Sequence, residues 1–311
     1  MAATTYAQDA AVGTPALGYV FDEAAQALRA VRGLPGAALV EDPLDAGFPI
    51  RSAAISSKRN FALVTAGDSS VRLLRFQDSG AAAALDEAMP SPDRMLLSSG
   101  GSSALLYRAG RLQSVAGLPE RPVVRDWNAS LLFDAGVPMA ISDDARLIAL
   151  APGGDDPAAV RLLSSDGGSS RMPMPGSIVA LAFHRSRRDL LALTANGDLC
   201  LVRDAGADTP CRIFPGAAAP DGTAVQFSPD GARAYLAAAG GNLSIVDLDT
   251  GDVTRLSCGC RASSLDPTTL EMVFRLSPVG DPPLLLFDAS QVEPRVWFVP
   301  RGGRRSEGGS R

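Results

Sequence analysis

The stretch from Ala224 to Leu256 constrains the fold most, because it contains four short apolar runs separated by turn-forming residues. The runs are Ala224–Phe227, Ala232–Ala238, Leu243–Leu248 and Val253–Leu256. Each run is too short for an ordinary helix, and each separator contains the Gly, Pro, Asn or Asp residues that close tight turns. We therefore expect four antiparallel strands joined by hairpins.

The apolar runs do not alternate cleanly between apolar and polar residues; Tyr235 and Leu236, for example, are followed by three alanines. A strand that is apolar on both faces is buried on both faces, as happens when one blade of a propeller is packed between two others. The Ser228-Pro229-Asp230-Gly231 corner, the strand after it and the closing D-x-x-T-G-x-V at residues 247–253 resemble the blade repeats of bacterial WD40-like and YVTN-type β-propellers. This resemblance implies an all-β propeller but no particular activity, because the architecture carries both binding scaffolds and unrelated enzymes.

Weaker copies of the unit recur along the chain. Corner tetrapeptides begin at Ser56, Ser91, Ser142, His184 and Ser228, and a degenerate copy lies near Asp266-Pro267. The intervals between the first five are 35, 51, 42 and 44 residues, in keeping with the ~40–45 residues of a propeller blade. We attribute the long interval to an insertion over residues 117–136. Six units plus an amino-terminal strand pair predict seven four-stranded blades with the first incomplete; six blades is the alternative.

The propeller is predicted to be a single domain over residues 16–300. Residues 1–15 and the Gly, Ser and Arg-rich tail at 301–311 lack apolar periodicity, so we expect both to be disordered. The chain has no apolar leader and no apolar run of the ~20 residues that span a bilayer. A cytoplasmic protein is the default expectation, and a periplasmic or secreted one if the given start is truncated.

The charge balance and the tail bear on the choice of partner. The formal net charge of −5 provides no basic field for nucleic acid. A single Arg301-Gly302-Gly303 element is weak evidence for RNA binding, so nucleic acid is not the expected partner. We expect a monomer that binds other proteins.

The four cysteines form two local pairs, Cys200 with Cys211 and Cys258 with Cys260. Each pair is open to two interpretations, a disulfide or free thiols, and the second pair also to a third, two metal ligands. The chain has one histidine and no second cysteine pair at zinc spacing, so neither a metal site nor a cofactor is predicted.

No catalytic residue is predicted. His184 occupies the corner position that serine holds in other units, and no nucleophile with an orienting acid lies near it in sequence. The corner aspartates, Asp93, Asp143, Asp144 and Asp230, each have a local duty in a turn.

A ligand-binding site is predicted at the channel mouth opposite the corners, with Arg51, Glu87 and Asp221 as its candidate residues. The leading hypothesis is a non-enzymatic binding scaffold. The alternative is a propeller enzyme, lactonase-like or quinoprotein-like, with its site at the mouth of the central channel. An enzyme should gather carboxylates, a histidine or a metal around one point, whereas a scaffold should line the channel with backbone and small side chains.

Overall fold

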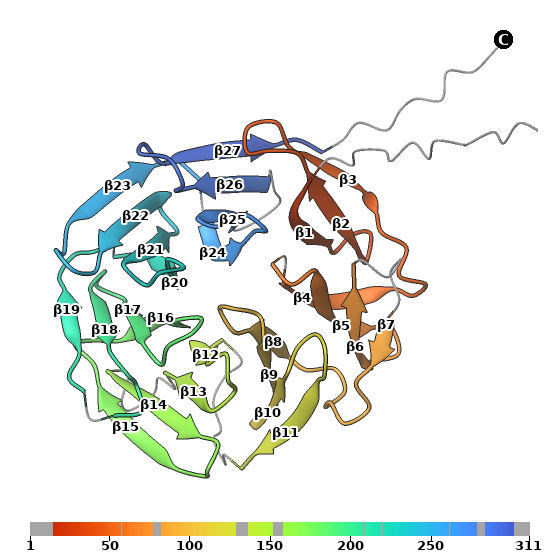
Figure 1. Ribbon diagram of the computed structural model, residues 1–311, viewed down its shortest axis with the longest axis horizontal. Coiled ribbons are helices and arrows are strands. Elements are labelled where there is room, and N and C mark those ends of the chain that lie inside the picture. Colours follow the sequence, from red (N-terminus) through yellow and green to blue (C-terminus); the bar gives the residue numbers. More distant parts are fainter. Residues whose placement is uncertain are drawn as a thin grey trace, which may run out of the picture.

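The computed structural model is a seven-bladed β-propeller, as predicted (Figure 1). It describes residues 15–301 except 57, 77–81, 129–135, 152–157, 208, 219, 261 and 279–283. Both segments expected to be disordered thus lie almost entirely outside the described residues. Seven antiparallel sheets surround a central axis, and the described part of the chain contains no helix. No described helix, therefore, is long and apolar enough to cross a membrane.

Each blade is a meander of consecutive strands. Blades 1 to 3 comprise β1 (Ala16–Asp22), β2 (Ala27–Arg32) and β3 (Leu39–Pro43); β4 (Ile50–Ser56), β5 (Phe61–Ala66), β6 (Val71–Arg75) and β7 (Ala82–Ala84); and β8 (Arg94–Leu97), β9 (Ser103–Arg108), β10 (Arg111–Ala116) and β11 (Val123–Trp127). Blades 4 and 5 comprise β12 (Met139–Ile141), β13 (Leu147–Leu150), β14 (Ala159–Ser164) and β15 (Ser169–Pro173); and β16 (Ile178–Phe183), β17 (Leu190–Thr194), β18 (Leu199–Val202) and β19 (Arg212–Phe214). Blades 6 and 7 comprise β20 (Gly222–Phe227), β21 (Arg233–Ala238), β22 (Asn242–Asp247) and β23 (Val253–Ser257); and β24 (Ala262–Pro267), β25 (Val273–Pro278), β26 (Leu284–Asp288) and β27 (Arg295–Val299).

The core lies between neighbouring blades, which explains why the runs are apolar on both faces. Between blades 5 and 6, for example, Leu191 and Leu193 share one buried cluster with Val225 and Leu236. In blades 2 to 7 the first strand is innermost and the last is outermost (Figure 1).

Blade 1 has three strands among the described residues, in agreement with the prediction that it is incomplete. Its first strand, β1, packs Leu17 against Val273 of β25, which is the second strand of blade 7. The same second-to-second contact joins Leu63 of β5 and Leu106 of β9. We infer that β1 occupies the second position of its blade, and that no described strand fills the innermost one.

The corner after each inner strand is built on one buried polar residue. These residues are Ser56, Ser98, Ser142, His184, Ser228 and Thr268, each at most 8% exposed. The Ser142 and Ser228 hydroxyls accept the backbone N–H groups of Leu147 and Arg233 at 3.0 and 2.8 Å. Successive residues of this set are 42, 44, 42, 44 and 40 positions apart, so the repeat is more regular than the sequence motif indicated.

One of the predicted corners is wrong. Ser91-Pro92-Asp93-Arg94 leads into β8 instead of following it, and the corner of blade 3 is Ser98-Ser99-Gly100-Gly101. The Ser-Pro-Asp sequence was a misleading signal because it also suits the crossing between blades, where the Ser91 N–H bonds to the Ser69 carbonyl at 2.9 Å. The predicted insertion over residues 117–136 was therefore also wrong, since this stretch carries the outer strand of blade 3.

The ring closes by direct contact between blades 7 and 1. The Thr269 N–H donates to the Leu17 carbonyl at 2.9 Å, and the Val40 N–H donates to the Pro300 carbonyl at 3.2 Å. Gly36, at φ +85°, packs so closely on Trp297 that a Cβ there would lie 3.0 Å from the indole ring. Among the described residues no strand is exchanged between the two terminal blades, because each sheet is built from consecutive strands.

Candidate binding site in the central cavity

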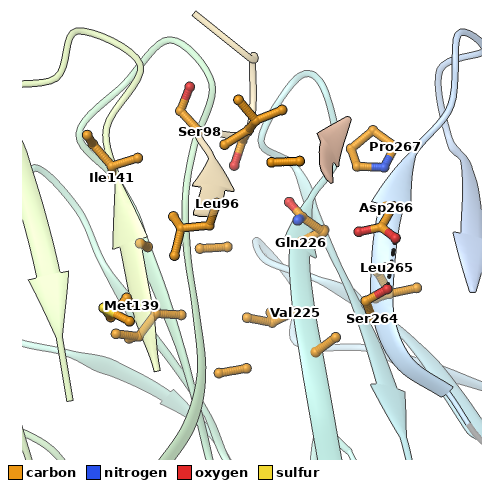
Figure 2. A pocket seen from close by; sticks show the side chains of 18 of the residues that line it. Leu96, Ser98, Met139, Ile141, Val225, Gln226, Ser264, Leu265, Asp266 and Pro267 are labelled. Atoms are coloured by element: carbon orange, nitrogen blue, oxygen red, sulfur yellow. Dashed lines mark hydrogen bonds between the residues drawn. The ribbon is translucent and has the colours of Figure 1, made fainter. Parts of the chain in front are cut away.

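A cavity of about 420 Å³ lies on the axis of the ring, within the size range of small-molecule sites. Its walls are the first strands of blades 2 to 7 (Figure 2). The faces of each sheet are covered by neighbouring blades, so an inner strand turns its edge, with alternate backbone N–H and C=O groups, toward the axis. The cavity therefore offers both donors and acceptors around its circumference.

Apolar side chains border the same space. Figure 2 shows Leu96, Met139, Ile141 and Val225 around the opening. Met139 and Ile141 belong to the buried cluster between blades 3 and 4, and Val225 to the cluster between blades 5 and 6. Because packing fixes these side chains, the wall has a defined shape.

An ion pair occupies the side of the cavity next to blade 1. The Arg275 guanidinium donates to Asp266 Oδ2 at 2.5 Å through Nη2 and at 3.2 Å through Nε. Its Nη1 donates to the Tyr19 carbonyl of β1 at 2.7 Å, and Ser264 Oγ donates to Asp266 Oδ2 at 2.9 Å. Arg275 thus bridges blades 7 and 1 where no described inner strand does so.

Beside the corner end of the cavity, charged side chains from three blades meet, and one of them, Lys58, lines the cavity itself. Glu271 Oε1 receives Arg185 Nη1 at 2.9 Å and lies 3.9 Å from Lys58 Nζ. The hydrogen bond from Arg185 is the main cause that lowers the pKa of the Glu271 carboxyl. Ser99 Oγ also reaches across from blade 3 to donate to the Phe183 carbonyl of blade 5 at 2.5 Å.

Lys58 is the only lysine in the sequence. It lines both the central cavity and a smaller pocket beside the corners of blades 5 to 7. Its side chain is 24% exposed. Burial lowers the pKa of the Lys58 ammonium, the charge of Arg185 lowers it further, and Glu271 opposes both effects. A second anion beside Lys58 would therefore stabilise its charged form.

Gln226 lines the same two spaces as Lys58. Figure 2 shows its amide at the wall of the opening. Its side chain has no hydrogen-bond partner among the described residues, so the amide can donate to, and accept from, a guest molecule.

The three predicted site residues lie on the side of the ring opposite the corners. On this side, the crossing side, the chain passes from the outer strand of one blade to the inner strand of the next. Arg51 is the second residue of β4, Glu87 lies between β7 and β8, and Asp221 directly precedes β20. All three are exposed, and they belong to different parts of the ring. The structure does not bring them together, and none of them lines the central cavity.

Each of the three has a different local setting. Arg51 Nη1 lies 3.4 Å from Ser69 Oγ and borders an open hollow of about 450 Å³ that also includes Phe48 and Arg72. The backbone carbonyl of Glu87 accepts the Gln113 amide at 3.3 Å. The backbone carbonyl of Asp221 accepts the Ala239 N–H at 3.0 Å.

His184 is a buried corner residue, 3% exposed. Its Nδ1 accepts the Ser186 N–H at 3.2 Å, and its ring meets Phe227 edge-on at 5.3 Å. Burial, followed by the charge of Arg187, lowers the pKa of the imidazole. It is not among the residues that line the central cavity.

The cysteines of each pair lie side by side. Cys200, in β18, has its sulfur 1.99 Å from that of Cys211, which directly precedes β19, and the two Cα atoms are 5.6 Å apart. Cys258 and Cys260 have their sulfurs 1.78 Å apart. Both pairs are thus placed as disulfides. Among the described residues no cluster of three or more His, Cys, Asp or Glu side chains is arranged to hold a metal.

Comparison with known proteins supports the fold and leaves the activity open. No family model matches the chain, and no curated protein matches it. A functionally unknown protein from Desulfotomaculum acetoxidans matches with a TM-score of 0.64 and 13% identity, over 93% of this chain and 100% of that one. PorZ from Porphyromonas gingivalis, a surface component of the type IX secretion system, matches with a TM-score of 0.62 and 12% identity, over 93% of this chain and 38% of PorZ. At these identities the likeness concerns the fold alone.

Proposed function

We propose that this protein is a non-catalytic scaffold that binds a protein partner through the crossing side of its propeller. The proposal rests on a contrast between polar side chains that form hydrogen bonds or ion pairs within the protein and polar side chains that form none. The corner serines bond to backbone, and Asp266 is paired with Arg275. On the crossing side, Glu87 and Asp221 are exposed and make no side-chain hydrogen bond or ion pair within the described structure, although the Asp221 carboxylate lies against Gly240. Charged side chains on exposed loops are available to complement a partner surface.

The composition of the cavity favours binding over catalysis. Asp266 is the one carboxylate that lines it among the described residues, and it is already held by Arg275 and Ser264. The lactonase-like or quinoprotein-like alternative would draw support from a cluster of Arg51, Glu87 and Asp221, and these residues lie apart. The scaffold is therefore the function that the geometry supports best.

The test compares how strongly the native protein and a variant with reversed charges on the crossing side bind a protein partner. We would compare the native protein with the triple variant Arg51→Glu, Glu87→Lys, Asp221→Lys and with the control Glu293→Lys, an exposed residue between β26 and β27. The native protein and the control should capture the same partner, which the triple variant should bind at least tenfold more weakly. Equal capture by all three proteins would refute the proposal.

A further inference from the structure

Among the described residues, the charged side chains that line the central cavity are three cations and one carboxylate: Lys58, Arg94, Arg275 and Asp266. Asp266 balances Arg275 at 2.5 Å. Arg94 lies at the start of β8, on the crossing side, and its Nη1 donates to the Val137 carbonyl at 2.6 Å. The inner wall thus carries an excess of positive charge, although the whole chain is acidic.

At the corner end of the cavity two cations converge on one carboxylate. Lys58 and Arg185 share a single oxygen of Glu271, at 3.9 and 2.9 Å. One carboxylate oxygen serves two cations there, and the longer distance leaves Lys58 with the weaker share. The Glu271 side chain is 58% exposed, so solvent screens the pairing further.

We propose that the central cavity binds a small amphipathic organic anion, a carboxylate with an apolar body, whose charged end lies at Lys58 and Gln226. The Lys58 ammonium provides a charge-assisted hydrogen bond and the Gln226 amide a second donor. Ile55, Leu96 and Leu181, which line the cavity and are only half-buried, provide the apolar wall for the rest of the molecule. This site lies apart from the crossing-side residues, and the inference does not depend on the protein partner proposed above.

Lysine at this position has a consequence that arginine would not have. Twenty-eight of the 29 basic side chains are arginines, which keep their charge at any working pH. Lys58 can lose its charge, and burial together with Arg185 already lowers its pKa. Anion binding would therefore weaken as the pH rises through the pKa of Lys58, and an arginine at position 58 would abolish that dependence.

The test is calorimetric titration of the full chain with octanoate and with the neutral isostere 1-octanol. Octanoate should bind, and 1-octanol should bind at least tenfold more weakly. Lys58→Met should weaken octanoate binding at least tenfold, whereas Lys58→Arg and the control Arg111→Met, an exposed residue of β10, should remain within threefold of the native protein. The affinity of the native protein should fall at alkaline pH, and that of Lys58→Arg should not.

A second measurement uses the native protein only. An amine-selective reagent has one lysine to label, so mass spectrometry of the peptide that contains Lys58 reports on the site directly. Octanoate should protect Lys58 from labelling, and 1-octanol should not. Equal binding of the two ligands, undiminished binding to Lys58→Met, absence of octanoate binding at millimolar concentration or absence of protection would each overturn the inference.

Discussion

Replacing Ser228 with alanine tests the principle that one buried hydroxyl holds each corner of the ring. Ser228 is 3% exposed, and its Oγ accepts the Arg233 N–H at 2.8 Å and donates to Asp230 Oδ1 at 2.5 Å. The substitution removes few atoms from the core, so the cavity that it leaves is small. It deprives the part-buried Arg233 N–H of its acceptor, however, and the loss of such a hydrogen bond costs about 1 kcal/mol. We expect the free energy of unfolding to fall by about that amount.

Urea denaturation monitored by circular dichroism measures this change, with Ser170→Ala as the matched control. Ser170 is an exposed residue of the outer strand β15, so its loss should change stability by less than about 0.5 kcal/mol. The midpoint should shift without a change in the slope, because the substitution leaves the buried area intact. If Ser228→Ala were as stable as Ser170→Ala, the corner hydroxyls would not stabilise the ring.

The same variant makes a prediction about pH. The hydrogen bond from Ser228 is the main cause that lowers the pKa of the Asp230 carboxyl, followed by that from the Ala232 N–H. A carboxyl with a lowered pKa in the folded state stabilises the protein above its unfolded pKa, and this stabilisation is lost as the pH falls through the folded pKa. The difference in stability between the native protein and Ser228→Ala should therefore shrink in acid. A constant difference from neutral to acidic pH would contradict this reasoning.

Three further predictions concern other parts of the ring. Thiol titration of the denatured, unreduced protein should find no free thiol, because all four cysteines are placed in pairs; four thiols would exclude both bridges. Arg275→Met should lower the melting temperature more than Arg111→Met, since Arg275 is 19% exposed and joins blades 7 and 1, whereas the pair of Arg111 and Asp126 is 68% exposed on both sides; equal shifts would count against the bridge. Burial raises the pKa of Tyr235 to about 12, so the native protein should lose stability as the pH rises from the unfolded pKa of tyrosine, about 10, through 12. Its buried hydroxyl has no partner within the described structure, so Tyr235→Phe should be neutral or stabilising and should remove that alkaline loss, as denaturation at pH 8 and 11 would reveal.

The architecture was predictable because hairpin signals and two-sided apolar runs both act locally. The unit at residues 224–256 contains its strands β20 to β23 almost as predicted. Ser91 shows where local chemistry fails, since a Ser-Pro-Asp turn suits a crossing as well as a corner, and only strand pairing distinguishes them. The buried-residue series through Ser98 would have corrected the error, because its spacing is more even.

The cavity residues were harder to predict because they are brought together by the ring and not by the chain. Arg275 meets Tyr19 across 256 positions, and Lys58 of blade 2 meets Glu271 of blade 7. One sequence signal was available, the single lysine in a chain that otherwise uses arginine as its basic residue, and this lysine lines the cavity for which we propose a ligand.

The seam between blades 7 and 1 joins the first and the last blade of the described chain. Most neighbouring blades adjoin in sequence and can dock as soon as both exist, as in a linear array of repeats. The seam instead couples Thr269 with Ala16, 253 positions away, and so waits for the whole chain. Folding should therefore end at this junction, and transient opening should begin there. Amide hydrogen exchange should accordingly be fastest in the two terminal blades. Opening of the seam would convert the closed ring into an open arc whose two terminal blades are uncovered and can associate with another molecule.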